Sequence, residues 1–131
     1  LKSLGDIYAE EGNTKIAMDL INRALKISQE IDDKLGEIRC YLSLAKIFKI
    51  IGKFDVCIDY PKRCMEISEK IYNFVELPEI YYHYASVLTE IGEITEAKKI
   101  LEKALEMATN MGLPLATKMI REALQILEEK S

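Results

Sequence analysis

The sequence predicts an all-α protein built from three helical hairpins and one further helix on their C-terminal side. Two observations lead to this prediction. Apolar residues recur at intervals of three and four, as in Leu101, Ala104 and Ala108, which is typical of amphipathic helices. The chain also resembles itself when it is shifted so that Gly12 falls on Gly52 and Gly52 on Gly92, so the same hairpin is expected three times.

The internal repeat is clearest at positions that keep the size of their side chain. Small residues recur where two helices approach closely, and large apolar residues recur where the space between helices is filled. The aligned rows are Leu4, Leu44 and Tyr84; Gly5, Ala45 and Ala85; Tyr8, Phe48 and Leu88; Ala17, Cys57 and Ala97; and Ala24, Cys64 and Ala104. We expect repeats at about 1–32, 33–72 and 73–112, within a single array that spans residues 1–131.

The helices are predicted from their periodicity and from the residues that end them. Gly12, Gly52 and Gly92 each follow the first helix of a hairpin, where a left-handed residue closes a helix without steric cost. The predicted helices are 1–11, 14–30, 34–51, 54–71, 77–91, 94–110 and 114–129.

Turn residues and prolines mark the boundaries between hairpins. Asp32, Asn73 and Asn110 lie at the expected turns. Pro78 and Pro114 suit a first helical turn, because the missing N–H has no helical partner there.

Pro61 lies in the middle of the predicted helix 54–71, where it removes a backbone donor and crowds the carbonyl of Cys57. We expect a kink at this point. Two origins remain open, a structural one and a bend that reshapes a binding surface.

Composition and charge limit the partners that the chain is expected to bind. The 18 Lys and Arg against 22 Asp and Glu give a net charge of -4, so no basic field favours nucleic acid or anionic lipid. The longest stretch without charge, Ile80 to Thr89, is too short to span a bilayer. We predict neither a nucleic-acid nor a membrane partner. The first residue is Leu1, and we expect a fragment of a longer protein.

The three cysteines are interpreted as reduced core residues. Cys40, Cys57 and Cys64 lack the spacing of paired motifs, and each has apolar neighbours in a helical pattern. Reduced thiols are typical of a reducing compartment, so a cytoplasmic location is expected.

No catalytic, cofactor or metal site is predicted. His83 is the only histidine, which excludes sites that need two, and we interpret it as a surface polar residue within reach of Glu79. No phosphate-binding glycine loop or nucleophile elbow occurs. We expect a protein that is not an enzyme.

At the aligned rows the sequence resembles the tetratricopeptide repeat, in which the first helix carries a bulky residue, Leu-Gly and Tyr. This chain has Leu1, Leu4-Gly5 and Tyr8. The second helix of the motif carries Ala, a large residue and Ala. The three copies here are Ala17, Ile21, Ala24; Cys57, Pro61, Cys64; and Ala97, Leu101, Ala104. The repeat is longer than the usual tetratricopeptide unit, so the resemblance is to a long-helix form.

The resemblance implies a right-handed superhelical solenoid with a C-terminal capping helix. It also implies that the first helix of each hairpin lines a concave groove that binds a partner protein or peptide. Removing the packing rows leaves these candidates for the groove: Lys2, Asp6, Arg39, Ser43, Lys46, Lys49, Glu79, Tyr82, His83 and Ser86.

Two features of these candidates indicate what a ligand would contact. Arg39, Lys46 and Lys49 place positive charge along the middle repeat, where either a ligand carboxylate binds or the face is simply solvated. Tyr82 is the preferred anchor, since its ring buries area while its hydroxyl keeps a hydrogen bond.

The resemblance also indicates one class of partner that this chain is not expected to bind. Repeat domains that clamp the C-terminal carboxylate of Hsp70 or Hsp90 use Lys and Asn, then Asn, then Lys and Arg. The matching positions here are Lys2, Asp6, Ser43, Glu79 and His83, of which only Lys2 fits. No Hsp70/Hsp90 carboxylate clamp is expected.

The leading hypothesis is a protein–protein interaction scaffold that binds a partner peptide or helix in its groove. The first alternative is a regulatory or sensor segment of a larger signalling or transcription-regulating protein. The second is a structural module that self-associates weakly as a homo-oligomer through the exposed ends of its repeats.

Overall fold

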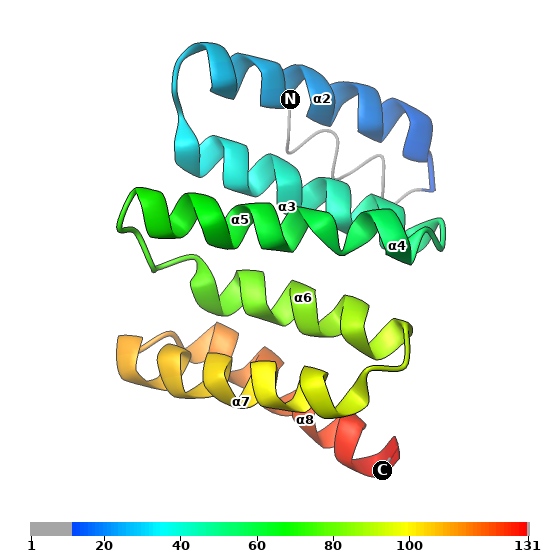
Figure 1. The fold of residues 1–131 in the computed structure, drawn as a ribbon, viewed down its shortest axis with the longest axis vertical. Helices are drawn as coiled ribbons and strands as arrows, with labels where there is room; N and C mark the ends of the chain where they lie inside the picture. The colour runs from blue at the N-terminus through cyan, green and yellow to red at the C-terminus, as the bar shows by residue number, and fades with distance from the viewer. Residues whose placement is uncertain (1–11, 131) are drawn as a thin grey trace. The chain divides into compact units, whose positions relative to one another are not determined.

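A computed structural model describes residues 12–130, and this part of the chain is helical with no strand (Figure 1). Two compact units are present, one extending to Ile67 and the other beginning at Ser68, so that the boundary falls within one helix. The all-α prediction is confirmed for these residues. The single continuous array and its superhelical sense stay predictions.

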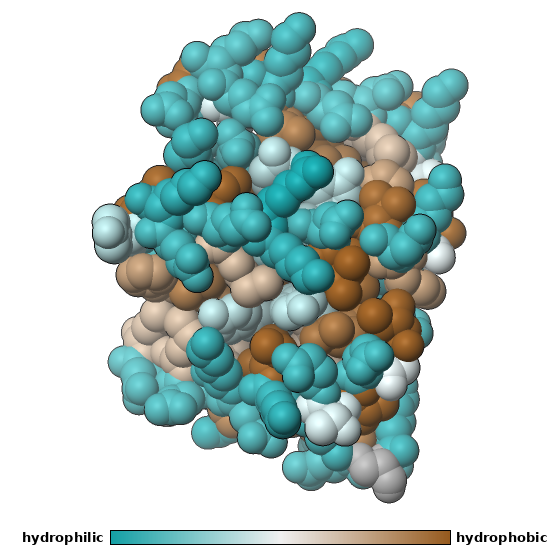
Figure 2. All heavy atoms as spheres, in the orientation of Figure 1, coloured by the Kyte–Doolittle hydropathy of each residue, from teal (hydrophilic) through white to brown (hydrophobic). Residues whose placement is uncertain are grey.

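Four helices belong wholly or in part to the first unit. They are α2 (Thr14–Glu30), α3 (Lys34–Ile50), α4 (Phe54–Cys57) and α5 (Asp59–Lys70). α2 and α3 run antiparallel, and α3 packs against both α2 and α4 (Figure 1). Fully buried Ile21, Ile38 and Ile47 form the centre of this unit. On the face drawn in Figure 2, α2 presents mainly hydrophilic side chains.

Three further helices belong to the second unit. They are α6 (Leu77–Glu90), α7 (Ile94–Met111) and α8 (Pro114–Lys130). α6 packs against α7, α7 packs against α8, and α8 also reaches back to α6. Ile80, Leu101 and Ile120 are at most 2% exposed and hold the three helices together. Burying a side chain of this size contributes about 1.5–3 kcal/mol.

The predicted helices agree closely with the observed ones, with one exception that involves Pro61. Pro78 lies in the first turn of α6 and Pro114 is the first residue of α8, so both proline predictions are confirmed. The predicted helix 1–11 lies outside the described residues.

The predicted helix 54–71 is divided at Ile58 into α4 and α5. Ile58 keeps right-handed helical angles (φ -66°, ψ -24°), and its N–H donates to the carbonyl of Phe54 at 3.2 Å. Pro61 therefore lies in the first turn of α5, where its missing donor is tolerated. The expected disturbance is present just ahead of the proline, at Ile58, where regular helical hydrogen bonding is interrupted while the backbone keeps helical angles.

The helix ends repeat at half the hairpin period. Left-handed backbone angles occur at positions 12, 32, 52, 72, 92 and 112, which are evenly spaced along the chain. Four of these positions are glycine, and the other two are Asp32 (φ 58°) and Tyr72 (φ 52°). At each of the last five turns, the left-handed residue and the next one donate back to carbonyls of the preceding helix's last turn. The sequence pattern identifies Gly12, Gly52 and Gly92 and places Asp32 at a turn, but it gives no sign that Tyr72 is left-handed.

The second helices of the hairpins share inward-facing rows, which explains the repeat. One row runs through Ser28, Ser68 and Ala108, all buried. The hydroxyl of Ser68 is fully buried and has no hydrogen-bond partner among the described residues. A buried hydroxyl without a partner costs about 1–3 kcal/mol, so Ser68 is a weak point of its row.

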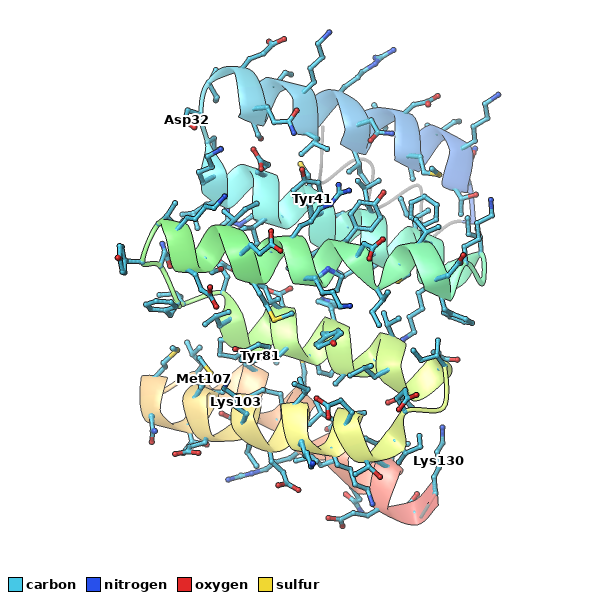
Figure 3. The ribbon with its side chains drawn as sticks, in the orientation of Figure 1. Asp32, Tyr41, Tyr81, Lys103, Met107 and Lys130 are labelled. Carbon is cyan, nitrogen blue, oxygen red and sulfur yellow. The ribbon has the colours of Figure 1, made fainter. Side chains whose placement is uncertain are left out.

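A cation lies over the bulky aromatic residue of the first helix in the second and third hairpins. The guanidinium of Arg63 is 5.6 Å from the ring centres of Tyr41 and Tyr60. The ammonium of Lys103 is 5.3 Å from the ring centre of Tyr81, and Figure 3 shows the two side chains close together. Because the two pairs lie one full repeat apart in the sequence, they are the same contact in two hairpins.

Candidate functional site

The cysteines are core residues, as predicted. Cys40, Cys57 and Cys64 form no disulfide and are at most 2% exposed. The Cys57 thiol donates to the carbonyl of Ala45 at 2.9 Å, and Cys64 donates to that of Ile38 at 3.4 Å. Burial raises the pKa of Cys57 from 9.0 to about 11, against a smaller opposite effect of the Lys49 ammonium. A thiol held protonated in this way is a poor nucleophile.

His83 is less exposed than predicted. Its side chain is only 15% exposed, and its ring lies edge-on against Tyr82 at a centroid distance of 5.5 Å. Its Nε2 is 3.7 Å from Oε1 of Glu79, whose side chain is 51% exposed. This separation is an ion-pair distance and is too long for a hydrogen bond. His83 is therefore half-buried and not fully on the surface, while Glu79 is its neighbour as expected.

Residues 12–130 contain neither a candidate metal site nor a helix that could span a membrane. No group of three or more His, Cys, Asp and Glu side chains there is arranged to hold a metal ion. No helix in the same range is both long enough and apolar enough to cross a membrane.

The candidate residues of the first unit divide into cations and one buried hydroxyl. Arg39 and Lys46 are exposed on α3, and Lys49 is half-buried. Ser43 is 3% exposed, because it lies on the same side of α3 as buried Cys40 and Ile47. Including Ser43 among the ligand-facing residues was therefore wrong. Lys2 and Asp6 lie outside the described residues.

In the second unit, two of the candidates line a cavity. α6 and α8 line a pocket of about 210 Å³ that is open to solvent next to Glu79 and Tyr82. Its lining residues are Pro78, Glu79, Tyr82, Leu115, Ala116, Met119 and Ile120. His83 and Ser86 are half-buried on α6 and are not among them. Of the candidates in this unit, Glu79 and Tyr82 line the pocket, and α8 supplies its other wall. We call this cavity the α6–α8 pocket.

The contribution of α8 was missed, although the sequence contained the signal. Continuing the repeat aligns Arg39 and Glu79 with Met119. The same shift aligns Lys46 and Ser86 with Ile126. Met119 is 39% exposed, Ile126 is 53% exposed and Leu115 is 71% exposed, so α8 carries an uncovered apolar stripe. The positions that carry Arg39 and Lys46 in α3 therefore carry apolar residues in α8.

Another face of α8 is polar at positions where the other first helices pack. Arg121 aligns with Tyr41 and Tyr81, and Gln125 aligns with Ala45 and Ala85. Arg121, Gln125 and the next such residue, Glu128, are all exposed. Arg121 and Gln125 line a broad hollow of about 560 Å³ beside the α7–α8 turn. At these positions α8 thus differs from α3 and α6, which carry aromatic or apolar residues there.

Comparison with known proteins agrees with this architecture. The family described as tetratricopeptide repeat matches residues 3–31 and 78–111. The chain is 31% identical to human tetratricopeptide repeat protein 19, mitochondrial, over 117 residues. It is 26% identical to human tetratricopeptide repeat protein 29 over 113 residues. These alignments cover 88% and 86% of this chain but only 30% and 23% of the two relatives, which are much longer.

A solved structure has the same fold. The crystal structure of the tetratricopeptide repeat domain of Arabidopsis FLU superposes with a TM-score of 0.75 at 20% sequence identity. The match covers 82% of this chain and 91% of that domain. The period, the rows of small and large residues, the helices and these matches agree with one another, and the chain belongs to the tetratricopeptide repeat family.

Proposed function

We propose that this chain is an interaction module that binds a peptide or helix of a partner protein. Tetratricopeptide repeats generally mediate protein–protein interactions. The observation that supports a binding role most directly is the α6–α8 pocket, where Leu115 and Met119 stay exposed beside an aromatic ring. Apolar surface left open within a hollow and bordered by polar groups is typical of a protein-binding site.

The proposal contains no catalytic step. Burial raises the pKa of the Cys57 thiol, and the thiol already donates to a backbone carbonyl. We also propose a reducing location such as the cytoplasm, because the three cysteines form no disulfide. Glu79 occupies a position where a carboxylate clamp needs Lys, so a partner's C-terminal carboxylate is not the proposed ligand.

The alternatives differ in how well the structure supports them. Self-association by stacking on α8 would bury the exposed Arg121 and Glu128, which carries a desolvation cost. A regulatory segment is the second candidate, since the relatives have 30% or less of their length in the matched region. In that case, binding at the α6–α8 pocket would be passed to neighbouring domains.

Affinity capture with paired baits tests the proposal. The native chain and its Lys46→Glu, Tyr82→Ala double variant are immobilised and exposed to a lysate of the source organism at moderate salt. Circular dichroism first checks that both baits are equally helical. A protein retained by the native chain and lost from the variant supports binding at these helices. Identical retention by both baits contradicts it.

A further inference from the structure

We infer that the α6–α8 pocket takes a large apolar side chain from a partner segment that carries Lys or Arg next to that side chain. The inference rests on the proposed function and names the chemistry of its ligand. Three properties of the pocket lead to it: its size, its single charged group and the adaptable residues of its α8 wall.

The size and lining of the pocket fit an apolar anchor. Its volume of about 210 Å³ exceeds the roughly 150 Å³ of an apolar cavity that holds a benzene ring. All but one of its lining residues are apolar or aromatic, namely Pro78, Tyr82, Leu115, Ala116, Met119 and Ile120. A polar anchor would lose its water there without gaining enough hydrogen bonds. A Leu, Ile, Met or Phe side chain fills the same space at no such cost.

The charge around the pocket selects a basic neighbour for that anchor. Glu79 is the only residue of the described lining that is charged at neutral pH, and half of its side chain is exposed. It already lies 3.7 Å from His83 Nε2, and its exposed side can accept a further cation from the solvent. A partner carboxylate placed there would face Glu79 across a partly desolvated wall, where like charges repel strongly.

The α8 wall can adapt to its ligand. Met119 has an unbranched, polarisable side chain that is 39% exposed, and Leu115 is 71% exposed. Methionine adjusts to irregular shapes, so the pocket does not require one particular apolar residue. Covering both side chains removes apolar surface from water, which provides the affinity. The apolar walls therefore select an apolar residue in the partner segment, and Glu79 selects the basic residue next to it.

Selection from displayed random peptides tests this chemistry without knowledge of the natural partner. The immobilised native chain is the target, and Met119→Asp and Val75→Asp are matched variants. Val75 is 63% exposed and lies outside the pocket lining, so it controls for a new surface carboxylate. Enriched peptides should pair a large apolar residue with an adjacent or nearly adjacent Lys or Arg. Their synthetic forms should bind Met119→Asp at least about tenfold more weakly and Val75→Asp almost unchanged.

A charge swap tests the role of Glu79 separately. Glu79→Lys should weaken the basic peptides about threefold or more, and changing their Lys or Arg to Glu should restore binding to this variant. Enriched peptides that carry acids beside the anchor, or that ignore Met119→Asp, would overturn the inference while leaving peptide binding intact. If the native chain enriches no peptide at all, the inference and the proposed function fail together.

Discussion

The second and third hairpins share one pattern of packing rows but build their second helix differently. In the third, α7 is continuous across Leu101, which is 2% exposed. In the second, Pro61 occupies the aligned position and the helix is divided into α4 and α5. The repeat frame survives this change. The buried residues on either side of the interruption, Cys57 and Cys64, still align with Ala97 and Ala104 of the third hairpin. An uninterrupted second helix is therefore not needed to keep the repeat in register.

Pro61 is itself buried at the leucine position of the second hairpin, and an aromatic cluster lies next to it. Tyr60, next to Pro61, stacks on Tyr41 and Phe48 with ring centres 5.8 and 5.7 Å apart. Burial raises the pKa of Tyr60, as expected for a phenol drawn into this cluster. The third hairpin has Ile100 at this position, which has no ring to stack. The two hairpins thus carry different residues at two adjacent aligned positions, Tyr60 and Pro61 in one and Ile100 and Leu101 in the other.

Moving the proline into the third hairpin tests this comparison with the largest expected effect. Leu101→Pro should be about 3 kcal/mol less stable than Leu101→Ala, because α7 has no break to accommodate the lost donor. Both variants remove the leucine side chain, so their difference in urea unfolding isolates the backbone effect. Equal stabilities would show that α7 can be interrupted as easily as the second hairpin's helix.

The cysteine of the second hairpin should make its stability depend on alkaline pH. The folded thiol of Cys57 has a pKa of about 11 against 9.0 for an ordinary thiol, so the folded state keeps a proton that the unfolded state releases. This contribution is fully present below the ordinary pKa and is lost as the pH rises toward the folded value. Near pH 10.5 the loss should be ~2 kcal/mol.

Cys57→Ala is the matched control, since alanine occupies the aligned position 97 in the third hairpin. Urea unfolding of both proteins at neutral and alkaline pH gives the difference. Parallel pH profiles for the two proteins would contradict the effect of burial on this thiol.

The row of Ser28, Ser68 and Ala108 offers a third comparison. Ser68→Ala should raise the free energy of unfolding by about 1 kcal/mol, because it removes a buried hydroxyl without a partner. Ser28→Ala should raise the free energy of unfolding by less, since Ser28 is 7% exposed and its hydroxyl is closer to water. Thermal unfolding measures both. A loss of stability in Ser68→Ala would mean that a water molecule satisfies this hydroxyl in solution.

The smallest effect is expected at the turn after α5. Tyr72 has left-handed backbone angles and is 85% exposed, whereas the aligned residue after α7 is Gly112. Tyr72→Gly should stabilise the protein by about 0.5–1 kcal/mol. The substitution removes the strain of a non-glycine residue in this conformation, and part of that gain is offset because glycine gives the unfolded chain more conformational freedom. Tyr72→Ala serves as the control and should show no gain. Equal thermal stabilities of the two variants would remove the argument from strain.

The sequence was sufficient for helix positions because period and size are properties of the chain itself. Ala97 and Leu101 are recognisable as packing residues from their spacing alone. Exposure was harder to predict, because it depends on neighbouring helices. Ser43 and His83 look like surface residues in the sequence, but α3 and α6 are covered on several sides.

Only one wall of the candidate pocket could be predicted from the sequence, for a related reason. Glu79 and Tyr82 follow from their place in a first helix, but the pocket exists only because α8 supplies Leu115 and Met119. When α8 is regarded only as a cap, its residues are not aligned with those of α3 and α6. A pocket between two helices cannot be deduced from one of them alone.

The evenly spaced left-handed residues determine where this chain can change its length. One extra residue inside α7 would rotate everything after it by about 100° and turn buried rows such as that of Ala108 toward solvent. An extra residue beside Gly92 or Gly112 lies between helices, where no row crosses it. Insertions and deletions are therefore expected to be tolerated at these turns, which are also the natural places to graft a tag or a foreign loop.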